Sequence, residues 1–424
     1  MKHFDYLTAV MRRLQALVLA TAFLTGLFRA SSEGTKLDHS TDKTNYPYVF
    51  VHGFFGWGQY DKGSDKLTYW GMFSGDLVKK VDNSGFTAVA ASVDTVGSAW
   101  DRACELYAQL TGQRVDYGKA HSAQFDHDRY GEDFTGRALL EQWDSEHKIN
   151  LIAHSFGGPT STLFASILAY GADAEIAATT DGSLSDFFKG GKTDWIYSIT
   201  GLAAAFNGTT LAMNHQALDD ISVYLNAQRD QKYAMVPEIL RKVPNYLTTK
   251  LFDGLEPIAS GEVADPDTGL WDMDPDQSVL LNQSIKTVPG IYYFSVPHDA
   301  TKDSDDGSHR VPDKEVCDTF FVPSVYIIGH TDTVTKGGMV LDKRWQPNDG
   351  LVNTISETAP FDKESDTVGA QPSVALAQNG FSKGVYHIFP TYIGAHMVLL
   401  GNVLSKTDKG MPYLYDLMLM INAL

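Results

Sequence analysis

The stretch Ile149-Asn150-Leu151-Ile152-Ala153-His154-Ser155-Phe156-Gly157-Gly158 decides the fold. Its apolar first half, 149–153, is typical of a buried strand, and a helix-compatible run, 160–168, follows the two glycines. A serine between a strand and a helix, with small residues beside it, marks the tight turn that presents a nucleophilic hydroxyl to substrate. Ala153 stands where the motif G-x-S-x-G has its first glycine. The stretch therefore predicts a serine hydrolase with Ser155 as the nucleophile.

Other apolar runs of strand length lie on both sides of this stretch. Because strands alternate with crossover segments, they predict a mainly parallel central sheet with helices on both faces, the α/β-hydrolase fold. We expect one domain over residues 46–424, preceded by an N-terminal segment, 1–45. Two insertions are predicted within it, one for metal binding at about 95–135 and an apolar helical lid at about 213–252. The further strands are expected at 46–51, 87–93, 195–200, 290–296 and 384–389.

Composition and the N-terminus limit the function. The 424 residues include 52 acidic and 34 basic ones, and the net charge of −18 argues against binding to nucleic acid. Arg12-Arg13, the apolar run 14–28 and Ala30-Ser31-Ser32 are typical of a signal peptide, which predicts a secreted protein. A surface-lying amphipathic helix is the alternative.

The acidic runs 299–306 and 362–366 indicate solvated loops, and the sequence leaves open whether Cys104 and Cys317 pair.

Acyl transfer requires two N–H donors for the developing oxyanion. The backbone N–H of Phe156, directly after the nucleophile, is expected to be one donor. His52-Gly53-Phe54 closes the strand 46–51, where hydrolases of this fold place the second, so Phe54 is expected to supply it. An ordinary turn at the end of a strand is the alternative for His52-Gly53.

The acid and the base should follow the nucleophile in the order serine, acid, histidine. His396 comes shortly after the strand 384–389 and before an apolar helical pattern, 397–404, which predicts that it is the base. His387 lies inside that strand and is expected to be packed there. Asp349, in the turn-rich Asn348-Asp349-Gly350, is predicted to orient the base, although such a triplet is also common in plain turns.

Two histidines and two aspartates suggest a metal site. Asp101, His121, His127 and Asp272 could form a closed tetrahedral zinc site, which would be structural because no position is left for water. Spacing alone leaves the alternative that these histidines are solvated or packed in the core.

The chain resembles the zinc-containing bacterial triacylglycerol lipases of the thermophilic Bacillus and staphylococcal type from about Tyr46 onward. The resemblance implies a triad of Ser155, Asp349 and His396, oxyanion donors at Phe54 and Phe156, and zinc on Asp101, His121, His127 and Asp272. It rests on Val51-His52-Gly53-Phe54, Trp100-Asp101-Arg102-Ala103-Cys104-Glu105, Val115-Asp116-Tyr117-Gly118, Ala153-His154-Ser155, Gly208-Thr209-Thr210-Leu211 and Asn348-Asp349-Gly350-Leu351-Val352-Asn353.

Among the departures from that family, two bear on the nucleophile and on calcium. Phe156 replaces the glutamine after the nucleophile, which keeps the backbone donor but adds an apolar ring. Val398 stands where the family has a glutamate for calcium, so a calcium site is not expected.

The sequence thus predicts a carboxylic ester hydrolase, foremost a triacylglycerol lipase that acts on acylglycerols at a lipid–water interface. The alternatives are a carboxylesterase or polyester-degrading esterase with a more open site, and a non-catalytic binding protein on the same scaffold.

Overall fold

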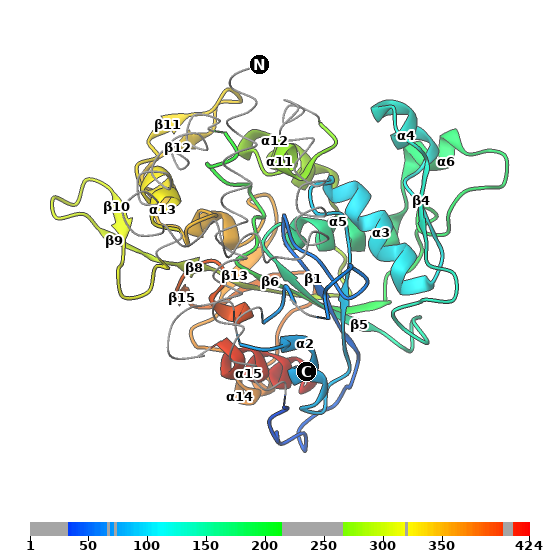
Figure 1. Ribbon diagram of the computed structural model, residues 1–424, viewed down its shortest axis with the longest axis horizontal. Helices are drawn as coiled ribbons and strands as arrows, with labels where there is room; N and C mark the ends of the chain where they lie inside the picture. The colour runs from blue at the N-terminus through cyan, green and yellow to red at the C-terminus, as the bar shows by residue number, and fades with distance from the viewer. Residues whose placement is uncertain (1–32, 66–67, 72–73, 214–265, 319–320, 402–409) are drawn as a thin grey trace, which may run out of the picture.

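The computed structural model in Figure 1 describes residues 33–65, 68–71, 74–213, 266–318, 321–401 and 410–424. The signal-peptide-like segment and all of the predicted lid except Met213 lie outside these residues. Both therefore stay predictions from the sequence. Within the described part of the chain, no helix combines the length and the apolar character needed to cross a membrane.

A seven-stranded sheet forms the centre of the molecule, in the order β13-β14-β7-β6-β5-β1-β2. Every neighbouring pair is parallel, as the alternation of strands and crossovers predicts. The strands are β1 (Tyr48–Val51), β2 (Ala88–Ala91), β5 (Ile149–His154), β6 (Ile196–Leu202), β7 (Tyr292–Val296), β13 (Ser365–Thr367) and β14 (Tyr386–Ile388).

Helices cover both faces of this sheet, which confirms the α/β-hydrolase fold (Figure 1). Alternate residues of β1 point to opposite faces: Val49 and Val51 belong to one buried cluster, Tyr48 and Phe50 to the other. The first cluster lies under α3 (Ala99–Thr111) and α5 (Gly157–Tyr170). The second lies under α2 (Leu77–Asp82), α14 (Val374–Asn379) and α15 (Gly410–Asn422).

Smaller elements surround the sheet. The antiparallel pair β3–β4 precedes and follows α4, within the predicted metal-binding insertion. The remaining elements are β3 (Arg114–Asp116), α4 (Lys119–Phe125), β4 (Tyr130–Asp133), α6 (Asp173–Ala178), α11 (Gly269–Asp272), α12 (Pro275–Ser284), β8 (His298–Asp299), β9 (Thr301–Asp303), β10 (Arg310–Pro312), α13 (Val322–Gly329), β11 (Thr333–Val334), β12 (Val340–Leu341), η3 (Lys343–Trp345), η4 (Thr354–Glu357), β15 (Tyr392–Ile393) and η5 (Val398–Leu400).

The structure corrects the predictions for the acidic runs and for the segment after His396, and it answers the open question of the two cysteines. The acidic run 362–366 leads into the edge strand β13, which is exposed and therefore tolerates polar residues, and the run 299–306 contains β9. After His396, the apolar pattern begins only the short 3₁₀ helix η5, which ends at Gly401 in the left-handed region (φ 67°). Cys104 and Cys317 are both free thiols.

Candidate active site and metal-ligand cluster

Ser155 occupies a strained turn between β5 and α5. Its φ is +56°, a conformation that costs a residue with a Cβ about 1–2 kcal/mol, and its N–H donates to the Leu202 carbonyl at 3.0 Å. The chain turns this tightly because a Cβ at position 157 would lie only 2.4 Å from the Val51 oxygen, so only glycine fits there. The predicted nucleophile is thus held at the carboxyl end of β5.

Asp349 and His396 form a buried pair beside this turn. His396 Nδ1 lies 2.5 Å from Asp349 Oδ2, and the His396 N–H donates to the Asp349 carbonyl at 2.9 Å. Asp349 Oδ1 accepts the N–H groups of Leu351 (2.9 Å) and Val352 (2.8 Å). Burial alone would raise the pKa of Asp349, but His396 and these donors lower it below its usual value. Asp349 is therefore a carboxylate that can orient the imidazole of His396.

His154 connects the nucleophile turn to the loop of His396. Its ring lies 4.5 Å from the His396 ring between centroids, and its Nε2–H donates to the His396 carbonyl at 3.0 Å. Its Nδ1 accepts from the Tyr69 hydroxyl at 2.5 Å. Burial lowers the pKa of His154 well below its usual value, so the ring is neutral. The structure thus places the Asp349–His396 pair against His154, the residue that precedes Ser155.

The two predicted oxyanion donors also lie beside this turn. Phe54 follows β1, and Phe156 is the residue before α5; their rings are 6.4 Å apart between centroids. A Cβ at position 53 would lie 2.6 Å from the Ser155 Cβ, so the turn after β1 approaches the nucleophile closely. Neither Phe54 nor Phe156 donates its N–H to an acceptor among the described residues.

Arg102 holds the turn that carries Phe54 in place by hydrogen bonds. In the sequence it stands out only as part of a motif. Its buried guanidinium donates to the carbonyls of His52 and Asp94 (2.6 Å for Asp94) and to the Thr160 hydroxyl (3.1 Å). It also lies 5.1 Å from the centroid of the Phe156 ring. Burial lowers the pKa of Arg102 to about 10, which leaves it charged at neutral pH.

Replacing Arg102 with methionine is expected to lower the free energy of unfolding by roughly 1–3 kcal/mol, because the buried His52 carbonyl oxygen loses its donor. The turnover number should also fall, by about tenfold or more, because the Phe54 N–H loses its support. Urea denaturation and esterase kinetics measure the two effects. Arg344→Met is the matched control, because that side chain is 69% exposed and pairs with Asp342. Equal losses in both variants would contradict the role given to Arg102.

Four side chains of the predicted metal-binding insertion and its surroundings converge on one point. One ligand atom from each of Asp101, His121, His127 and Asp267 lies within 4.8 Å of the others. His121 Nε2 is 3.1 Å from Asp101 Oδ1 and 3.1 Å from Asp267 Oδ1, and His127 Nε2 is 3.3 Å from Asp267 Oδ2. Asp101 Oδ1 and both Nε2 atoms are buried and have no hydrogen-bond partner in the part of the chain that the structure describes. Such buried donors fit a metal ion.

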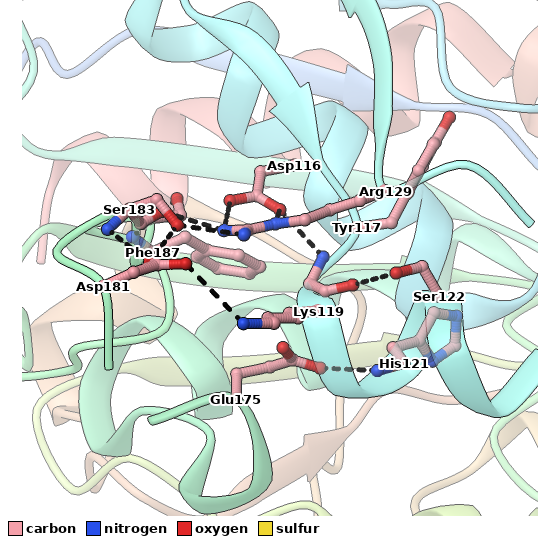
Figure 2. A network of polar contacts seen from close by, with 12 residues as sticks. Asp116, Tyr117, Lys119, His121, Ser122, Arg129, Glu175, Asp181, Ser183 and Phe187 are labelled. Atoms are coloured by element: carbon pink, nitrogen blue, oxygen red, sulfur yellow. Dashed lines mark hydrogen bonds and ion pairs between the residues drawn. The ribbon is translucent and has the colours of Figure 1, made fainter. Parts of the chain in front are cut away.

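The polar network in Figure 2 holds the start of α4, which carries His121. Both oxygens of the buried Glu175, on α6, accept N–H groups at the start of α4: Ala120 at 2.9 Å and His121 at 2.7 Å. His127 Nδ1 faces the Asp128 carbonyl at 2.9 Å, which leaves Nε2 as the lone-pair nitrogen. The ring of Trp100 stacks on His121.

The structure places Asp267 in this cluster, where the sequence predicted Asp272. Asp272 Oδ2 accepts the Ala99 N–H at 2.7 Å, so it caps the start of α3. Burial raises the pKa of Asp272 to about 7. Asp267 precedes α11, and its carboxylate faces the histidines. Both aspartates occur in a short acidic stretch, and spacing does not show which of them reaches the cluster.

Comparisons with known proteins identify relatives of this chain. The model of the family "Lipase-like, C-terminal domain" matches residues 44–417. A lipase of Staphylococcus hyicus is 33% identical over 378 residues, which are 85% of this chain and 54% of the relative. Lipase 1 of Staphylococcus aureus strain MRSA252 is 28% identical over 386 residues, 88% of this chain and 53% of the relative. The chain thus spans about half the length of these relatives.

Solved structures show the same fold over nearly their whole length. EstA from Clostridium botulinum superposes with a TM-score of 0.73 at 30% identity, covering 89% of this chain and 88% of that one. Lipase 1 from Pelosinus fermentans gives 0.70 at 30% identity, covering 88% and 97%. The Staphylococcus hyicus lipase gives 0.69 at 27% identity, covering 91% and 98%.

Proposed function

Because the chain belongs to the family of lipase-like C-terminal domains, we propose that it is a carboxylic ester hydrolase that forms an acyl-enzyme on Ser155. The observation that carries the proposal is the buried Asp349–His396 pair next to a serine held at positive φ. A serine presented in this way and a histidine oriented by a carboxylate are what acyl transfer requires.

In the proposed reaction, Ser155 Oγ attacks the ester carbonyl carbon while His396 Nε2 takes the hydroxyl proton. The N–H groups of Phe54 and Phe156 stabilise the oxyanion, and His396 then gives its proton to the departing alcohol. Water attacks the acyl-enzyme in the same way and releases the acid. Asp349 holds the imidazole in one tautomer and stabilises its positive charge without leaving its hydrogen bonds to Leu351 and Val352.

The proposed substrates are acylglycerols at a lipid–water interface. The names of the staphylococcal relatives support this class, and so does Ile393, which is 60% exposed and lies three residues before His396. The expected result is hydrolysis of p-nitrophenyl palmitate as well as butyrate, with tributyrin turnover rising above its solubility limit. Kinetics with and without emulsion measure both. Activity confined to short, dissolved esters would favour a carboxylesterase or polyester-degrading esterase instead.

We propose further that the metal-ligand cluster holds one zinc ion, on Asp101, His121, His127 and Asp267. Two imidazole nitrogens and two carboxylate oxygens are a zinc donor set, and four protein ligands close the site, which makes it structural. Zinc there would join the first turn of α3, the region of α4 and the segment before α11.

A further inference from the structure

A second group of titratable side chains lies behind the Asp349–His396 pair. His298, on β8, and Glu357, at the end of η4, each place a ligand atom within 4.8 Å of the other and of Asp349. All three side chains are fully buried. The triad proposed above does not use His298 or Glu357.

The hydrogen bonds of this group are incomplete. Glu357 Oε2 accepts the His298 backbone N–H at 2.5 Å. Glu357 Oε1 and both ring nitrogens of His298 have no partner among the described residues. Buried polar atoms without a partner are costly, so this pattern indicates a missing proton or ion.

Asp349 leaves little room for a cation in this group. Its Oδ1 already accepts two N–H groups and its Oδ2 pairs with His396, so a metal ion would have to compete with both oxygens' partners. A proton on Glu357 Oε1 removes the negative charge of this carboxylate and gives the oxygen a hydrogen bond to donate. It displaces none of the partners of Asp349. Two carboxylates buried side by side cannot both stay ionised without a cation.

The charged groups around Glu357 do not supply that cation. Asp299, on β8, adds a negative charge near Glu357. The nearby cation Arg310 is already paired: its Nη2 lies 2.9 Å from Asp299 Oδ2, and its Nη1 pairs with Asp303. His298 is neutral, because burial lowers its pKa to about 4. Burial and the charge of Asp349 raise the pKa of Glu357 well above its usual value.

We propose that Glu357 is a neutral carboxylic acid that positions the triad acid Asp349. Its Oε1–H donates a hydrogen bond within the His298–Asp349 group, where a carboxylate would repel Asp349. Asp349 then remains the single negative charge opposite His396. The role rests on the proposed function, since it assumes that Asp349 serves the reaction.

The pH dependence of Glu357→Gln tests the positioning role. An amide is neutral and can donate, so the midpoint of the acidic limb of kcat/KM for p-nitrophenyl butyrate should stay at the wild-type pH. Glu357→Met is of similar size but cannot donate, so its kcat should fall while kcat of Glu357→Gln stays closer to the wild type. If Glu357 were ionised, Glu357→Gln would remove a negative charge near His396 and move the midpoint roughly one unit lower, which would overturn the proposal.

A stability measurement separates this inference from the proposed reaction, because it needs no activity. Above the pH where the unfolded glutamate ionises, about 4.3, the folded wild type holds one proton that the unfolded chain has lost. This proton alone makes stability fall as pH rises, whereas the buried neutral His154 and His298 make stability rise with pH below about 6.5. Urea denaturation between about pH 5 and 8 should therefore show, at each pH, a slope of stability against pH that is more positive by one proton in Glu357→Gln and Glu357→Met than in the wild type.

The same measurements are repeated in the Ser155→Ala background. If the slopes differ there while that variant is still active, the proposed reaction fails and the neutral Glu357 stands. Equal slopes in the wild type and both variants would overturn the neutral acid. So would elemental analysis that finds a second divalent ion in the wild type, absent from Glu357→Gln.

Discussion

Replacing Ser155 with alanine is expected to lower the turnover of p-nitrophenyl butyrate by about 10⁴- to 10⁶-fold. Without the hydroxyl there is no acyl-enzyme, and only binding and the N–H groups of Phe54 and Phe156 remain to assist attack by water. A fluorophosphonate probe should label the wild type on Ser155 and leave the variant unlabelled. Intact-mass spectrometry and steady-state kinetics measure the two effects.

The matched control is Ser161→Ala. Ser161 lies two turns further along α5, and its buried hydroxyl makes no hydrogen bond with the described residues, so its removal should change neither labelling nor turnover. Labelling of the Ser155→Ala protein at the wild-type rate would mean that another residue is the nucleophile. Absence of labelling in the wild type would favour a non-catalytic binding protein.

Replacing Asp267 with asparagine is expected to abolish binding of the zinc ion proposed for the metal-ligand cluster, whereas Asp272→Asn is expected to keep it. Asp267→Asn changes a residue of the metal-ligand cluster itself. Its zinc affinity should therefore fall by more than the roughly 10- to 100-fold that is typical when a residue hydrogen-bonded to a ligand is replaced. At free zinc of about 1,000 times its Kd, the ion adds about 4 kcal/mol to stability, so its loss should also lower the melting temperature.

Elemental analysis of the purified proteins should find about one zinc per chain in the wild type and in Asp272→Asn, as one four-ligand site requires. EDTA should lower the melting temperature of these two proteins and leave that of Asp267→Asn unchanged. Retention of zinc by Asp267→Asn together with its loss from Asp272→Asn would restore the ligand set expected from the sequence.

The sequence predicted the buried strands well because of where they lie. β1 and β5 are covered on both faces, so they consist mainly of apolar residues, and such runs are visible in any single sequence. β13 has no such run: it lies at the edge, is exposed, and is held by backbone pairing with β14 and by the contact of Asp366 with His387. Polar edge strands and loops look alike in a sequence.

The site shows the same division. Ser155, Asp349 and His396 could be predicted because chain order and turn residues mark them, and the structure pairs Asp349 with His396 beside His154. Tyr69 supports His154 from 85 positions away, and no local pattern marks it. Asp267 could not be chosen over Asp272, because the choice depends on the direction in which each carboxylate leaves the backbone.

The first turn of α3 contributes to two sites, the metal-ligand cluster and the turn that carries Phe54. Asp101 belongs to the metal-ligand cluster, and its neighbour Arg102 holds the turn that carries Phe54. Successive helical residues leave the axis about 100° apart, so the two side chains reach different sites from one short piece of backbone. A change that moves this turn alters both sites together. Protein engineers who vary the insertion should therefore expect the start of α3 to tolerate few substitutions.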